Sequence, residues 1–106
     1  MNIQKMLKQA QEMQSKLGSL QAEMEAREFE GAAGGGAVKL TLTGKGHLTR
    51  IALDASLMNA AEKDMLEDLI TAAHRDAKEK ADAAMADAMG ALTGGLNLPA
   101  GMKLPF

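Results

Sequence analysis

The stretch GAAGGGAVKLTLTGKG, from Gly31 to Gly46, decides how this chain must be organised. It holds six of the eleven glycines of the chain beside two lysines, a composition that first suggests a loop that cradles phosphate. Within it, the residues from Val38 to Thr43 alternate between apolar and polar side chains, which is typical of a β-strand with one buried face. The question is whether the glycines bind a nucleotide or only let the chain turn.

The spacing of these glycines argues against a nucleotide site. A P-loop has a glycine six positions before its lysine and a hydroxyl residue after it, but Lys39 stands six positions before Lys45, and Gly46 follows. The dinucleotide-binding pattern fails as well, since its third glycine is missing. Both motifs also open a helix, whose amides meet the phosphate, whereas these glycines precede strands. They are therefore predicted to form turns.

Three short strands are predicted around these turns, over residues 28–31, 37–43 and 47–54. The turn at 43–46 makes the last two a hairpin. In the third strand the apolar positions step unevenly from Leu48 to Ile51, which predicts a bulge near Thr49 or Arg50. The result is a three-stranded antiparallel sheet.

Two long helices are predicted on either side of the sheet. Over residues 2–25 the apolar side chains recur in alternating steps of three and four, the seam of a helix that packs on another helix. The second helix, over residues 60–90, has Asn59 as its N-cap and Glu62 three positions later, as in a capping box. After Ile70 the apolar stripe changes from leucine to alanine. The second half of this helix is therefore predicted either to pack very closely on a neighbouring element or to be only partly covered. Residues 93–106, interrupted by prolines, are predicted to form an extended tail.

The lengths of these elements predict a homodimer. The helices would measure about 35 and 45 Å, and a seven-residue strand about 23 Å, so both helices extend beyond the sheet. Their projecting apolar stripes need a partner, and the open edges of a small sheet invite pairing. The expected fold is α+β, one domain of 106 residues. The predicted interface comprises Met13, Leu17, Leu20, Val38, Leu40 and Leu42.

Composition limits the function further. No cysteine is present, and no apolar run reaches the length of a membrane span or a signal sequence, so a cytoplasmic protein without a membrane role is expected. His47 and His74 lack a neighbouring set of metal ligands, and the acidic residues of the second helix suit a solvent-exposed face. We therefore predict no catalytic, cofactor or metal site, no small-molecule substrate and no enzymatic activity.

The basic residues cluster although the net charge is −2. Lysines at positions 5, 8 and 16 lie on the first helix, and a group that includes Arg75 and Lys78 lies on the second. Some of these side chains have acids four positions away, such as Lys8 with Glu12, which would only stabilise a helix. Phosphate contact by the projecting helices is the functional alternative.

Four segments in this order resemble the YbaB/EbfC family of bacterial nucleoid-associated proteins. They are MLKQAQEMQSKL (6–17), EFEGAAGGGAVKLTLTGKG (28–46), DMLEDLITAAHRDA (64–77) and LTGGLNLPAGMKLPF (92–106). The resemblance implies a homodimer shaped like tweezers, associated with the nucleoid, whose helical arms bind double-stranded DNA and alter its conformation. Carried over by position, it implies DNA contacts by Lys5, Lys8, Lys16, Arg75 and Lys78.

A second function remains open from the sequence alone. The methionine-rich seam of the first helix would also suit a protein interaction module, in which the arms clamp a partner and the lysines only keep the chain soluble.

Overall fold

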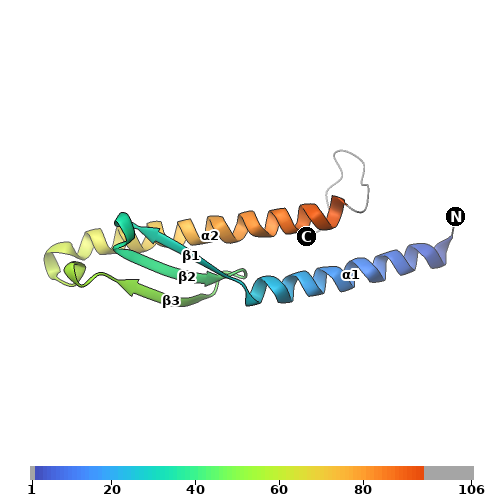
Figure 1. The fold of residues 1–106 in the computed structure, drawn as a ribbon, viewed down its shortest axis with the longest axis horizontal. Coiled ribbons are helices and arrows are strands. Elements are labelled where there is room, and N and C mark those ends of the chain that lie inside the picture. The colour runs from blue at the N-terminus through green and yellow to red at the C-terminus, as the bar shows by residue number, and fades with distance from the viewer. Residues whose placement is uncertain (1, 95–106) are drawn as a thin grey trace.

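The computed structural model describes residues 2–94, which form two long helices and a three-stranded antiparallel sheet (Figure 1). The helices are α1 (Ile3–Ala26) and α2 (Lys63–Gly94), and the strands are β1 (Glu28–Ala33), β2 (Val38–Thr43) and β3 (Leu48–Leu53). The predicted α+β class is confirmed. The extended tail predicted for 93–106 lies outside the described residues, except that Thr93 and Gly94 belong to α2.

An asparagine side chain caps the start of α1 and of the helical segment that leads into α2. The Asn2 side chain accepts a hydrogen bond from the Lys5 N–H at 3.2 Å, which satisfies one of the free amides of the first turn of α1. Asn59 does the same for the Glu62 N–H at 3.1 Å. That second cap opens a short 3-10 turn, Ala60–Glu62, which continues into α2, so α2 starts three residues later than predicted.

The glycine-rich segment forms the turn between β1 and β2. Gly34, Gly35 and Gly36 all have positive φ angles, of 64°, 68° and 97°. This left-handed backbone costs little for glycine and is strained for other residues. Strand β1 runs on to Ala33, two residues beyond the predicted end, so these three glycines and Ala37 make the turn.

The strands pair in the order β1, β2, β3, with both pairs antiparallel. Thr41 lies opposite Arg50, but Leu42 lies opposite Leu48, so Thr49 is an extra residue in β3. This irregularity confirms the predicted bulge and brings both Leu48 and Ile51 to the same face as Leu40.

Helix α2 packs directly on the backbone of β1 at Gly31. A Cβ atom at this position would lie 2.0 Å from the Ala73 carbonyl oxygen and 2.5 Å from the Ala77 nitrogen, so only glycine permits the contact. Ala73 and Ala77 are fully buried there. The alanine stripe of α2 is thus explained over this part by very close packing.

Two apolar clusters join the layers. Val38, Leu40 and Leu42 of β2 lie under Ala73 and Ala77, with Leu57 closing one end. At the other end of the sheet, Met24 of α1, Phe29 of β1 and Ala81 of α2 form a smaller cluster. The first cluster fixes α2 on the sheet, and the second is where α1 joins the rest of the chain.

The molecule is elongated, with principal extents of 69 × 26 × 17 Å. Beyond the second cluster, α1 and the C-terminal half of α2 project from the same end of the sheet (Figure 1). The predicted overhang of both helices is therefore present. Across residues 2–94, no helix is both long and apolar enough to cross a membrane.

We expect Gly31→Ala to lower the free energy of unfolding by about 3 kcal/mol, because the added Cβ meets main-chain atoms of α2 and the helix must shift. Urea denaturation followed by circular dichroism, at one fixed protein concentration, measures this difference.

Gly18→Ala is the matched control for this change. A Cβ at Gly18, in the middle of α1, would have no atom within 4 Å, so alanine should stabilise the helix by up to about 1 kcal/mol. Equal urea midpoints for Gly31→Ala and the unchanged protein would contradict the proposed contact.

Candidate nucleic-acid interface

Three lysines occupy one side of α1. Lys5, Lys8 and Lys16 are exposed, and at about 100° per residue their side chains fall within about 80° of one another. The apolar seam of α1, which includes Leu20 and the buried Met24, runs beside them, with Leu20 one helical turn after Lys16. Because Leu20 and Met24 pack beside Ala81 of α2, Lys8 points away from α2, whereas Lys5 and Lys16 lie at the flank of the seam.

These lysines are not neutralised by acids. Among the described residues, the salt bridges are Lys45–Glu25, Lys63–Glu67, Lys78–Asp82 and Lys80–Asp76, and none involves Lys5, Lys8 or Lys16. Glu12 is the only acid between residues 3 and 17, against three lysines. The projecting half of α1 therefore carries a formal charge of +2 in a chain whose net charge is −2.

Helix α2 offers a weaker site for an anion. It carries four basic and seven acidic residues, a formal charge of −3 without the histidine. Arg75 lies two positions from both Ala73 and Ala77, so it points away from the sheet into solvent. Lys78 forms a salt bridge with Asp82. Arg75 and Lys78 therefore lie on a different helix from the other three candidate residues, and this helix has a net negative charge.

Two further basic residues lie on the face of the sheet that α2 leaves open. Lys39 and Arg50 line a hollow of about 250 Å³ together with Glu30, Thr41 and Ala52. Lys45, the third basic residue of this part of the sequence, is paired instead with Glu25 at 3.4 Å. Since Glu30 belongs to the same hollow, this surface has mixed charge.

The apolar residues expected at a dimer interface fall into two groups. Met13, Leu17 and Leu20 are half-buried on the seam of α1. Val38, Leu40 and Leu42 are at most 2% exposed, because α2 of the same chain covers them. The second group therefore has no exposed surface for a partner to cover. The exposed apolar side chains of the sheet lie on β3 instead.

All six residues of β3 are exposed. Leu48 and Ile51, which share the apolar face of the sheet, are 56% and 44% exposed, because α2 lies over β1 and β2. They border a hollow of about 300 Å³ between β3 and α2. Its other lining residues are Leu40, Ile70, Thr71 and His74.

The opposite edge of the sheet is closed by side chains of α2. The Ala32 N–H donates to Asp76 Oδ2 at 3.1 Å, and Lys80 Nζ donates to the Glu30 carbonyl oxygen at 2.9 Å. Asp76 and Lys80 also form a salt bridge, which their spacing of four residues suggests from the sequence. Their bonds to β1 could not be foreseen, because nothing in the sequence shows which helix face lies beside that edge.

Among the described residues, no three His, Cys, Asp or Glu side chains gather closely enough to hold a metal ion. His74 borders the hollow beside β3, and His47 lies in the turn between β2 and β3. The structure does not bring the two histidines into one site with acidic partners.

Comparison with known proteins relates the chain to a DNA-binding family. The YbaB/EbfC DNA-binding family matches residues 1–96. A nucleoid-associated protein of Granulibacter bethesdensis is 55% identical over 105 residues, covering 99% of this chain and 98% of the relative. One from Methylocella silvestris is 52% identical over 101 residues, covering 95% and 94%.

The fold also occurs in a solved structure. An uncharacterised protein from Helicobacter pylori superposes with a TM-score of 0.70 at 19% identity, covering 91% of this chain and 97% of the other. At this identity the likeness establishes the fold alone. The arrangement of two long helices and a three-stranded sheet is thus shared by a distant sequence.

We expect the stabilising effect of Asp76 to depend on pH. Its pKa lies below the ordinary 3.8, because the carboxylate accepts the Ala32 N–H and a bond from Lys80. A carboxyl group whose pKa falls on folding stabilises the protein above its unfolded-state pKa, and this contribution is lost as the pH falls through its folded-state pKa. Asp76→Ala should therefore lower the urea midpoint at pH 7, and the difference should shrink well below pH 4.

Asp82→Ala is the control for the Asp76 measurement. Asp82 also pairs with a lysine four positions away, but it accepts no bond from the sheet, so its loss should change the midpoint little. If Asp76→Ala lowered the urea midpoint equally at pH 7 and well below pH 4, ionisation of Asp76 would play no part in its stabilising effect.

Proposed function

Because the chain belongs to the YbaB/EbfC DNA-binding family, we propose that it binds duplex DNA mainly through phosphates, with little sequence preference. In this proposal the protein acts with the nucleoid as a homodimer, and it bends or compacts DNA with effects on gene expression and DNA protection. The family is a DNA-binding one, which agrees with the prediction that the chain is not an enzyme.

The observation that carries the proposal is the set of unpaired lysines on α1. Lys5, Lys8 and Lys16, on a projecting helix, form no salt bridge with another described residue, while Lys45, Lys63, Lys78 and Lys80 are each held in one. A lysine ammonium group on a flexible stem attracts phosphate without reading base edges. Both long helices also exceed the short pair of a helix-turn-helix motif.

The orientation of α1 suggests how a duplex would approach. Since Lys8 points away from the apolar seam and Lys5 and Lys16 lie at its flank, DNA would meet the exposed side of α1 that these lysines share. Arg75 could add a contact only where the duplex also passes the outer face of α2. Lys78 would contribute less, because Asp82 already offsets its charge.

The uncovered side of β3 supports a second copy of this chain as its partner. Asp76 and Lys80 occupy the edge at β1, whereas β3 leaves Leu48 and Ile51 exposed beside an apolar hollow. Two copies meeting there around a twofold axis would each cover the exposed strand of the other. The α1 helices of both copies could then engage one duplex, and two linked contacts bind much more tightly than one.

We expect the double change Lys5→Gln and Lys8→Gln to lower affinity for a random-sequence duplex about tenfold at low salt. A plot of log affinity against log salt should become shallower by about one for each lost phosphate contact. Gel shifts over a salt series, repeated with unrelated sequences, measure both effects.

Lys63→Glu is the matched control for charge. It changes the formal net charge from −2 to −4, as the double change does, but Lys63 lies at the start of α2, within a salt bridge to Glu67. Affinity should stay near that of the unchanged protein. If the α1 double variant bound DNA equally well, the lysines would serve only solubility, and a protein-clamping role for the arms would be favoured.

We expect Ile51→Glu to convert the dimer to a monomer, because a charged group at the centre of an apolar interface would be buried without a partner. Sedimentation equilibrium gives the mass. Ala52→Glu, on the other face of the same strand, should remain a dimer. A dimeric Ile51→Glu protein would exclude this surface as the interface.

A further inference from the structure

Helix α1 is attached to the rest of the protomer through its last two turns. Met24 is 1% exposed in the cluster with Phe29 and Ala81, and Leu20 packs beside them. From Ile3 to Lys16, every residue except the half-buried Met13 is exposed. The direction of the whole arm therefore depends on contacts close to its C-terminal end.

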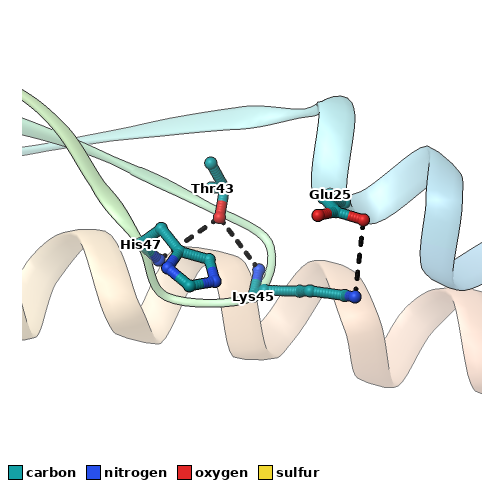
Figure 2. A network of polar contacts seen from close by, with 4 residues as sticks. All are labelled: Glu25, Thr43, Lys45 and His47. Atoms are coloured by element: carbon teal, nitrogen blue, oxygen red, sulfur yellow. Dashed lines mark hydrogen bonds and ion pairs between the residues drawn. The ribbon is translucent and has the colours of Figure 1, made fainter.

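One of these contacts is with the turn between β2 and β3, residues 44–47. The Gly44 N–H donates at 3.0 Å to the Met24 carbonyl oxygen at the end of the helix, which also accepts the Arg27 N–H at 3.2 Å. Lys45 Nζ lies 3.4 Å from Glu25 Oε2 (Figure 2). The turn thus holds both the backbone and a side chain of the last turn of α1.

The turn itself is held by its own polar contacts. The Thr43 hydroxyl oxygen accepts the Lys45 N–H at 3.3 Å and the His47 N–H at 3.2 Å (Figure 2). The Gly46 N–H donates to the Thr43 carbonyl oxygen at 2.8 Å. These bonds make the turn a defined support rather than a loose loop.

Glycine is required at position 44 because there is no room for a side chain, not because of its backbone conformation. A Cβ atom there would lie 2.3 Å from the Met24 carbonyl oxygen and 2.9 Å from the Met24 Cβ. The positive φ angles of the described glycines occur at Gly34, Gly35, Gly36 and Gly46, so Gly44 does not serve a left-handed turn. Any larger residue at position 44 must push the end of α1 away from the sheet.

A small tilt at this point has a large effect at the lysines. Lys5 lies 19 residues from Met24, or about 28 Å along the helix, so a tilt of about 10° moves it by about 5 Å. That displacement exceeds the 4 Å limit of an ion pair. In the proposed dimer, a tilt at this joint would therefore change whether the lysines of both α1 helices can reach the phosphates of one duplex together.

We infer that Gly44 and the turn it belongs to are the positioning element of the α1 arm for duplex DNA. This inference rests on the proposed function for the role of the lysines, but the arm geometry can be measured without DNA. The chain has no cysteine, so spin labels can be placed at Gln11→Cys on α1 and Ala86→Cys on α2, both exposed. Dilution with unlabelled protein keeps the measured pair within one protomer.

Pulsed electron paramagnetic resonance should give a narrow distance distribution for the labelled but otherwise unchanged protein. In the Gly44→Ala background, we expect the distribution to shift or broaden by about 3 Å, because Gln11 lies about 20 Å along the helix from Met24, and affinity for a random duplex to fall at least fivefold. Gly18→Ala, a glycine of α1 with open space around it, should leave the distance unchanged.

Lys45→Glu is a second variant that tests the same joint if Gly44→Ala does not fold. It places two acids at the joint and should broaden the distribution less than Gly44→Ala, while the exchanged pair Glu25→Lys with Lys45→Glu should restore it. An unchanged distance in every folded joint variant would overturn the inference, whatever the DNA affinity. If the unchanged protein did not bind DNA, the proposed function would be refuted, but the measured distances would still test the joint.

Discussion

The contact between Gly31 and the backbone of α2 at Ala73 and Ala77 determines much of the architecture. Glycine and alanine let the helix approach β1 so closely that α2 lies over β1 and β2 rather than across the whole sheet. Strand β3 is consequently left uncovered, and its apolar residues remain exposed. The same placement brings Asp76 and Lys80 beside β1, where they bond the free backbone groups of that edge. One edge is closed and the other is open for the same geometric reason.

The two long helices also differ in charge. The net negative charge of the chain is concentrated on α2, while the projecting half of α1 is positive and free of salt bridges. An acidic protein can therefore present a basic surface to DNA, because local charges within about 10 Å dominate over distant ones at moderate salt. Placing the lysines on a thin arm also makes their position sensitive to the joint at Gly44, since the arm has little other support.

Many features of the candidate interface were accessible from the residue pattern and the family resemblance. The three lysines of α1 were identified correctly as exposed helix residues, although their role in DNA binding stays a prediction. Arg75 and Lys78 were grouped with them by position, but the structure places them on an acidic helix. The interface prediction for Val38, Leu40 and Leu42 could not distinguish a strand buried by its own helix from one buried by a partner, because alternation reports only that one face is apolar.

The sequence by itself determined the local elements: the cap at Asn59, the glycine turn, the bulge at Thr49 and the helix lengths. Each follows from interactions between residues close in the chain, whose spacing can be read directly. Only the tertiary structure decided which strands α2 covers, which edge Asp76 and Lys80 close, and that Gly44 supports the end of α1. These contacts join residues 20 to 50 positions apart, and their geometry depends on how close two backbones can approach, which no local pattern encodes.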